Sequence, residues 1–209
     1  METGTSRVGA AVCLAGLALT AVGCGASGGR RRATPSSTRP PLAFRPGARA
    51  GAFATLRAGA APPTWRVARI SAGGALYYPP GWRLAPGDAG TATAVLLDAR
   101  RRTVGYLNLT PRQGGETLAD WTSFRVSHNV AEGERDVKSE AAARGVRFRT
   151  GIGACVRDSY TTISHTRFIE LACLVRGART TSVIVATAPP RAWRQTSPLL
   201  FRAIAALIT

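Results

Sequence analysis

The distribution of hydrophobic and polar positions divides the chain into three parts. An uninterrupted apolar run covers 8–22. The next part consists of Ala, Gly, Pro, Ser, Thr and Arg and shows neither helical nor strand periodicity. From Trp65 onward, short apolar runs rich in Val, Ile, Tyr and Thr alternate with turn residues. We therefore predict a signal segment at 1–23, a disordered tether at 24–64 and one folded domain at 65–209.

Six segments of the domain have the composition of β-strands. Pro79-Pro80-Gly81 ends the first of them, because two fixed φ angles and a permissive Gly suit a tight turn. The second and third are joined by 98–102 and predict a hairpin. The last three are joined by short turns at Ser164-His165 and Gly177-Ala178, so they run antiparallel. The six segments are 75–78, 91–97, 103–109, 146–162, 167–176 and 180–188.

Two helical patterns lie between the strands. The first begins at Thr117, an N-cap with Asp120 as its capping-box partner, and ends at Gly133. The second is weaker, spans 136–144 and stops at Gly145. One face of the first predicted helix carries a stripe at three-to-four spacing: Leu118, Trp121, Phe124 and His128.

A third helical pattern closes the chain, with Ser197 as the N-cap and Pro198 at the first helical position. Its apolar stripe requires a sheet face to cover it. The elements together predict the α+β class, with a central antiparallel β-sheet and helices packed on its faces. The stripe consists of Leu200, Phe201, Ile204, Leu207 and Ile208.

Cys155 and Cys173 are the two cysteines of the predicted domain. They are equally far from Ser164 in the sequence, so a hairpin that turns at Ser164 places them opposite each other. Opposed Cα atoms of antiparallel strands lie about 4.5 to 5.5 Å apart, within reach of a disulfide. We predict a structural disulfide between them. A redox or metal site is disfavoured, because the spacing is not CxxC and only two histidines could complete a metal shell.

The N-terminal apolar run is shorter than the ~20 residues that a transmembrane helix needs. It ends in Leu19-Thr20-Ala21-Val22-Gly23-Cys24, which resembles the lipobox of bacterial lipoprotein precursors. The resemblance implies cleavage before Cys24, lipid attachment to Cys24 and a position on the extracytoplasmic side of the cell membrane. Ala21 departs from the branched aliphatic residue usual at its position. A secretory signal cut after Ala21 or Gly23, and an uncleaved inverted anchor, remain alternatives.

The formal net charge is +17, from 28 Lys and Arg against 11 Asp and Glu. Such an excess favours anionic partners in general, among them phospholipid head groups, wall polymers and nucleic acid. We expect the membrane to be a partner through the lipid anchor, and the Arg residues of the tether either adhere to the anionic leaflet or only solvate the linker. No nucleic acid partner is expected, because export separates the chain from it and aromatic residues do not interleave with Arg100-Arg101-Arg102. We expect a monomer.

The sequence contains no motif of a known catalytic site, such as G-x-S-x-G, H-E-x-x-H, a phosphate loop or a dinucleotide fingerprint. His128 shares its stripe with apolar residues and is interpreted as a partly buried structural residue, and His165 falls in a turn. We expect no enzyme, metal or cofactor. A polar pocket with either histidine beside a carboxylate would favour an enzyme. Four acids are interpreted as a solvated connection: Glu132, Glu134, Asp136 and Glu140.

The segment Tyr78-Pro79-Pro80-Gly81-Trp82, followed by a strand pair that ends in Gly105-Tyr106-Leu107-Asn108, resembles the start of PsbP-like domains. The order of elements over roughly 70–208 is similar to that family as well. The resemblance implies an α/β/α sandwich used for binding and assembly more than for catalysis. We therefore predict a binding or assembly module of the cell envelope, whose ligand is an envelope protein or a small amphiphile. An envelope hydrolase or other enzyme, and an adhesion module for anionic wall polymers or lipid surfaces, are the alternatives.

Overall fold

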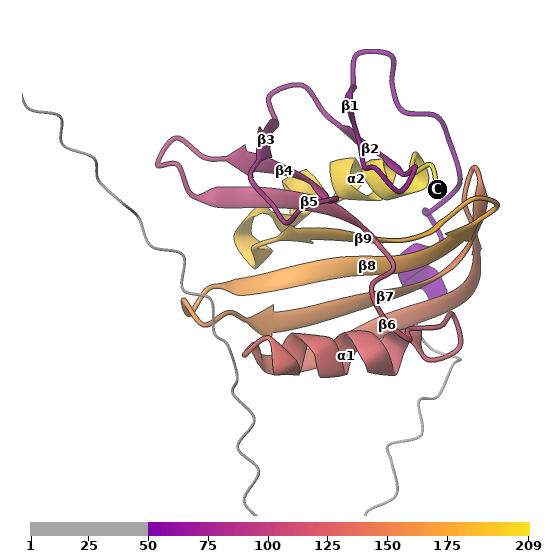
Figure 1. Cartoon of the computed structure of the whole chain (residues 1–209). Helices are drawn as coiled ribbons and strands as arrows, with labels where there is room; N and C mark the ends of the chain where they lie inside the picture. Colours follow the sequence, from indigo (N-terminus) through magenta and orange to yellow (C-terminus); the bar gives the residue numbers. More distant parts are fainter. Residues whose placement is uncertain (1–49) are drawn as a thin grey trace, which may run out of the picture. The chain divides into compact units, whose positions relative to one another are not determined.

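A seven-stranded antiparallel sheet forms the centre of the structure, a computed structural model that describes residues 50–209 (Figure 1). Its strands lie in the order β3-β4-β5-β9-β8-β7-β6, and β1 and β2 form a separate hairpin. The predicted signal segment, Cys24 and 24–49 of the predicted tether lie outside the described residues. The strands are β1 (Arg66–Arg69), β2 (Ala75–Tyr78), β3 (Arg83–Ala85), β4 (Ala92–Leu97), β5 (Thr103–Pro111), β6 (Arg135–Arg147), β7 (Gly151–Thr161), β8 (Arg167–Gly177) and β9 (Thr181–Ala188).

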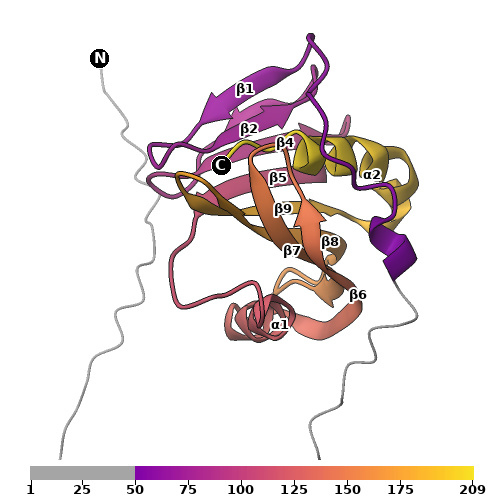
Figure 2. The ribbon, with the colours of Figure 1, turned by 90° about the vertical axis from the view of Figure 1, so that its right-hand side faces the viewer.

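One helix covers each face of the sheet, as Figures 1 and 2 show: α1 (Trp121–Ala131) on one side and α2 (Pro190–Ala205) on the other. Two clusters of buried side chains correspond to these two layers. The larger contains Leu200, Ile204 and Leu207 from the C-terminal stripe, and the smaller is centred on Trp121. The predicted α+β class and the layering of helix, sheet and helix are therefore confirmed.

The predicted pair of Thr117 and Asp120 forms reciprocal hydrogen bonds, but the N-cap of α1 is Asp120 and not the predicted Thr117, and Asp120 makes no side-chain cap bond. The backbone N–H of Thr117 donates to Asp120 Oδ1 at 2.7 Å, and the Thr117 hydroxyl accepts from the backbone N–H of Asp120 at 3.3 Å. These reciprocal bonds close a turn, and the helix itself begins at Trp121. Gly133, which was predicted to end the helix, has a φ of 89°, a left-handed conformation that suits glycine at a helix end.

The predicted helix at 136–144 is wrong, because this segment belongs to β6. Its run of alanines favours a helix locally, but pairing with β7 along most of its length outweighs that preference. The register shifts at three places along the pair, and Asp136 has a φ of 54°. These irregularities removed the two-residue alternation by which a strand is recognised in a sequence.

The C-terminal helix starts earlier than the predicted N-cap at Ser197. It begins at Pro190 after Pro189, and Pro198 lies inside it. A proline at the first helical position has the required φ and loses no helical hydrogen bond. Pro198 is exposed, so water can reach the carbonyl group whose helical partner this proline removes. Leu200, Ile204 and Leu207 of the predicted stripe are buried in the core as expected, whereas Phe201 is only partly buried.

The domain also begins earlier than the predicted boundary at residue 65. A short 3₁₀ helix, η1 (Ala50–Phe53), precedes β1, and Phe53 and Leu56 are only 6% and 8% exposed. Both belong to the larger core cluster, and the backbone N–H of Gly59 donates to the Ala205 carbonyl group at 3.2 Å. Two large apolar side chains were too few to predict order from the sequence, but the α2 face of the sheet supplies the surface that buries them.

The predicted disulfide is confirmed. Cys155 and Cys173 are direct partners in the register of β7 and β8, their Cα atoms lie 4.1 Å apart and their sulfurs are bonded. The hairpin turns through His165, which is exposed and has a φ of 59°. Both cysteines are fully buried on the α2 side of the sheet, so the bond crosslinks two central strands within the larger core.

Candidate functional site

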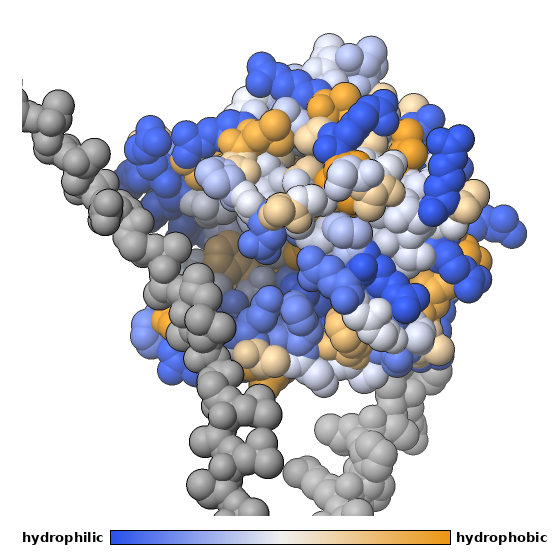
Figure 3. Space-filling model, in the orientation of Figure 1, coloured by the Kyte–Doolittle hydropathy of each residue, from blue (hydrophilic) through white to orange (hydrophobic). Residues whose placement is uncertain are grey.

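A cavity of ≈ 450 Å³ lies between α1 and the sheet, and it is called the α1 cavity below. Figure 3 shows this side of the molecule hollowed above α1, with hydrophobic residues at the base of the hollow. Its floor comes from β5 and β9, one wall from α1, and another from the segment that connects β5 to α1. The floor residues are Tyr106, Asn108, Thr110, Val183 and Val185.

The α1 wall carries a series of stacked rings. The ring centroids of Trp121 and Phe124 are 5.8 Å apart, and those of Phe124 and His128 are 5.9 Å apart, with nearly parallel planes in both pairs. The indole N–H of Trp121 donates to the Ala172 carbonyl group at 3.0 Å, which fixes the ring against β8. Three residues of the predicted stripe, Trp121, Phe124 and His128, lie on α1 and border the α1 cavity. Leu118 precedes the helix and is not among the residues that line the cavity.

Three carboxylates border the same cavity: Asp88 from the turn between β3 and β4, Glu116 from the connecting segment, and Glu132 just after α1. Glu116 is only 3% exposed. Its Oε1 accepts a bond from the backbone N–H of Gln113 at 3.0 Å, whereas its Oε2 is buried without a hydrogen-bond partner. The polar walls of the cavity are therefore acidic.

A buried charged cluster lies beneath this cavity. Arg125, on the sheet side of α1, donates from Nε and Nη2 to the two carboxylate oxygens of Glu170 at 2.6 and 3.0 Å. The Tyr160 hydroxyl donates to Glu170 Oε2 at 3.1 Å. Asp158, the register partner of Glu170, is fully buried, and neither oxygen of its carboxylate has a hydrogen-bond partner. Burial raises the pKa of Asp158 to about 7, and the neighbouring Glu170 carboxylate adds to this rise.

His128 does lie beside a carboxylate in the α1 cavity, the arrangement that would favour an enzyme. Its Nε2 is 3.0 Å from Glu132 Oε1, but the two are one helical turn apart and their side chains are 41% and 55% exposed. In the described part of the chain, the hydrogen bonds and ion pairs join no hydroxyl or thiol to His128. His165 lies in the exposed β7–β8 turn, where its Nδ1 is 3.2 Å from Arg135 Nη2.

The acids predicted to form a solvated connection have different surroundings in the structure. Glu132 borders the α1 cavity, and burial raises the pKa of Glu134, with Glu132 contributing. Glu140 lies on β6 and its Oε2 is 3.0 Å from Arg157 Nε. These different environments were not predicted, because 136–144 was interpreted as a helix and not as part of a strand.

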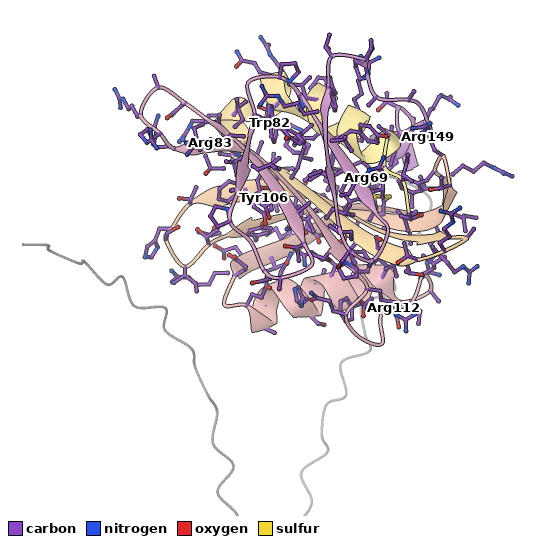
Figure 4. All side chains as sticks on the ribbon, turned by 45° about the horizontal axis from the view of Figure 1, so that its top comes forward. Arg69, Trp82, Arg83, Tyr106, Arg112 and Arg149 are labelled. Atoms are coloured by element: carbon purple, nitrogen blue, oxygen red, sulfur yellow. A yellow bond between two sulfur atoms is a disulfide. The ribbon has the colours of Figure 1, made fainter. Side chains whose placement is uncertain are left out.

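The arginines that Figure 4 labels are spread over the domain. Arg69 and Arg83 lie on β1 and β3, whereas Arg112 and Arg149 lie in connections between elements, and their labels are at separate places in the view. The exposed turn between β4 and β5 carries a further cluster at 100–102, where Arg102 Nη2 is 2.7 Å from Asp98 Oδ2. These positions provide a general positive field without forming one anion site.

A second cavity of ≈ 550 Å³ lies between the segment after η1 and the outer side of α2. It is lined by Phe201 and Pro198, with Arg57 and Arg202 at its border. No buried polar side chain without a partner faces it among the described residues. The α1 cavity is therefore the stronger candidate for a binding site.

Comparisons with solved structures identify the fold. One similar structure is that of the cyanobacterial PsbP protein, CyanoP, of Synechocystis, with a TM-score of 0.52 and 12% sequence identity. The match covers 72% of this chain and 95% of CyanoP. The domain therefore has the PsbP-like fold that the sequence predicted.

Two other solved structures match less well. A protein of unknown function from Pseudomonas aeruginosa, a putative regulator, has a TM-score of 0.41 and 10% identity, covering 69% of this chain and 96% of its own. LpqN, involved in cell envelope biogenesis of Mycobacterium tuberculosis, has a TM-score of 0.38 and 16% identity. That match covers 64% of this chain and 79% of LpqN. No family model and no curated protein matches the sequence. Within 50–209, neither helix has the length and hydrophobicity to cross a membrane.

Proposed function

We propose that the domain is a non-enzymatic binding module that holds a small amphiphilic molecule in the α1 cavity. The observation that carries this proposal is the composition of the cavity, which places stacked rings on one wall and carboxylates on another. Binding sites for small molecules have this combination of apolar surface with a few polar groups, and their volumes are roughly 300 to 1,000 Å³. The cavity falls within that range.

A catalytic role is less well supported by the same residues. His128 and Glu132 could transfer a proton, but hydrolysis also needs a positioned nucleophile or metal. Among residues 50–209, no group of three or more potential metal ligands exists. Binding requires only the shape and polarity that the cavity already has.

The proposal places the module outside the cytoplasm, tethered to the membrane through a lipid on Cys24. The lipobox-like sequence before Cys24 supports this position. The disulfide between Cys155 and Cys173 supports it independently, because structural disulfides persist in oxidising compartments. An envelope position would bring the cavity close to lipids and their precursors, which are amphiphilic.

Native mass spectrometry of protein extracted from the membrane fraction tests the binding function. Wild type should retain a non-covalently bound small molecule, and Thr110→Phe, which places a ring on the cavity floor, should lose it. Thr103→Phe, on the same strand outside the cavity, is the matched control and should retain it. Retention by Thr110→Phe, with its melting temperature unchanged, would show that the molecule binds elsewhere.

Intact-mass analysis tests the anchor. The wild-type chain should begin at Cys24 and carry the added mass of acyl chains, whereas Cys24→Ala should carry none. A full-length chain without added mass would contradict the lipid anchor and leave the cavity proposal intact.

A further inference from the structure

We propose that the α1 cavity selects an organic cation, an amphiphile whose head group is a protonated amine. This inference rests on the proposed binding function and adds the charge of the ligand. Three observations support it: the charge of the cavity differs from that of the whole chain, one buried carboxylate oxygen of Glu116 has no donor, and aromatic rings line the cavity.

The cavity has the opposite charge to the protein that contains it. The whole chain has 28 basic and 11 acidic residues. The cavity nevertheless has three carboxylates at its border, from Asp88, Glu116 and Glu132, and Arg125 as its one Lys or Arg residue. These three acids are distant in the sequence and all border the cavity. Asp88 and Glu132 are exposed, and Glu132 lies 3.0 Å from His128, whereas Glu116 is buried. The field inside the cavity therefore attracts a cation.

Arg125 does not offset this field. Both carboxylate oxygens of Glu170 accept bonds from its guanidinium group, in a buried bidentate pair. The Arg125 charge is thus neutralised by a residue beneath the cavity floor. An anionic head group would have to compete with Glu170 for Arg125 while facing three carboxylates, so anions are disfavoured.

Glu116 supplies the most specific contact for an ammonium group. Its side chain is almost fully buried, and one carboxylate oxygen has no hydrogen-bond donor within the described residues. A buried charged acceptor without a donor is costly to the folded state. Once the Glu116 side chain turns this oxygen toward the cavity, an ammonium N–H would provide the donor together with a balancing charge. A neutral hydroxyl head group would provide the donor alone, and an anionic head group would add a like charge.

The aromatic lining suits the same ligand. Trp121, Phe124 and Tyr106 border the cavity from two directions, the first two from α1 and the third from β5. Aromatic faces attract cations through their quadrupoles, and Trp does so most strongly. The rings also offer apolar contact to a hydrocarbon chain, so one cavity accommodates both parts of a cationic amphiphile.

Three probes with the same ten-carbon chain test the inference: decylammonium, decanol and decyl sulfate, each below its micelle concentration. Isothermal titration at pH 7 should give a Kd for decylammonium about tenfold or more below that for decanol, which corresponds to one charge-assisted hydrogen bond. Glu116→Gln keeps the acceptor for the Gln113 N–H and should remove most of this preference. Glu140→Gln removes an equal charge outside the cavity and should leave the preference unchanged.

The outcomes distinguish the charge inference from the binding function. If decanol and decylammonium bind with equal affinity and both are lost in Thr110→Phe, the cavity binds amphiphiles and the inferred cation selectivity is wrong. If decyl sulfate is the preferred probe and Thr110→Phe abolishes its binding, the inferred charge has the wrong sign. If no probe loses affinity in Thr110→Phe, the cavity is not the binding site and the proposed function itself is contradicted.

Discussion

Asp158 and Glu170 face each other directly across β7 and β8, and the folded domain treats these two buried carboxylates differently. Glu170 accepts bonds from Arg125 and Tyr160, whereas both oxygens of Asp158 have no partner. Two like charges at adjacent positions in a site with little water cannot both be stable near neutral pH. Glu170 therefore has the cation and the hydrogen-bond donors, and the raised pKa of Asp158, about 7, means that Asp158 holds its proton until the pH approaches that value.

This asymmetry predicts that Asp158 makes the fold less stable as the pH rises. In the unfolded chain this carboxyl group ionises near its ordinary pKa of 3.8, but in the folded state its pKa is raised to about 7. Between these values the folded state binds the extra proton, so the free energy of unfolding falls with rising pH and levels off above about 7. The total penalty is roughly 4 kcal/mol as an upper limit.

Asp158→Asn should therefore stabilise the domain at pH 8 and lose that advantage below about pH 4, as measured by urea unfolding across the range. Asp120→Asn provides a control of opposite sign, because hydrogen bonds from Thr117 lower the pKa of Asp120. That variant should be less stable than wild type at neutral pH, with the difference disappearing in acid. A stability difference for Asp158→Asn that does not change with pH would show that this carboxyl group is ionised throughout.

The pairing of Arg125 with Glu170 predicts a strongly non-additive mutant cycle. Arg125→Met should destabilise the domain by about 3 to 5 kcal/mol, because it leaves the Glu170 charge buried without a cation. Adding Glu170→Gln to Arg125→Met should recover much of that loss. Arg157→Met removes a more exposed ion pair with Glu140 and should cost less than about 1 kcal/mol. Additive single-mutant effects at Arg125 and Glu170 would contradict the buried pair.

The disulfide predicts a loss of stability on reduction. Cys155 and Cys173 are separated by 18 residues, and a crosslink that closes a loop of this size contributes about 3 kcal/mol in the chain-entropy model. Urea unfolding with and without a reducing agent measures the effect. Reduction should destabilise wild type and have no effect on Cys155→Ala/Cys173→Ala. Equal sensitivity of the two proteins would mean that the bond does not stabilise the native state.

The buried position of the segment before β1 predicts that Leu→Ala at Leu56 lowers the free energy of unfolding more than the same change at Leu84. Leu56 lies in the region interpreted as tether but is 8% exposed, whereas Leu84 on β3 is 54% exposed. Leu56→Ala should therefore cost about 2 to 4 kcal/mol in urea unfolding, and Leu84→Ala less than about 1 kcal/mol. Equal small effects would show that the segment does not pack against the domain in solution.

Local signals were sufficient to predict much of the fold. The turn residues between β7 and β8 set the register that brings Cys155 opposite Cys173, and the Thr117 and Asp120 pair marked the start of α1. β6 could not be predicted in this way, because its alanines have a helical preference and only pairing with β7 makes the segment a strand. Long-range pairing of this kind leaves little trace in a local window.

A groove between the sheet and its covering helices was expected, but the residues of the α1 cavity were not predicted, because its walls come from segments far apart in the chain. Two signals for it were nevertheless present. Arg125 and Asn129 follow Trp121 at four-residue spacing, which places polar residues on the same helical face as a buried ring. Asp158 and Glu170 occupy directly opposed positions in two central strands. Polar residues at such positions indicate a buried polar cluster next to a helix.

Binding of an amphiphilic cation in the α1 cavity can be followed through the indole N–H signals of the four tryptophans in an NMR titration with decylammonium. Trp121 borders the cavity, whereas Trp65, Trp82 and Trp193 do not and serve as internal references. We predict that the Trp121 signal shifts and saturates while the other three stay in place, and that Glu116→Gln raises the concentration required. A Trp121 signal that does not move, or four signals that move together, would contradict the account.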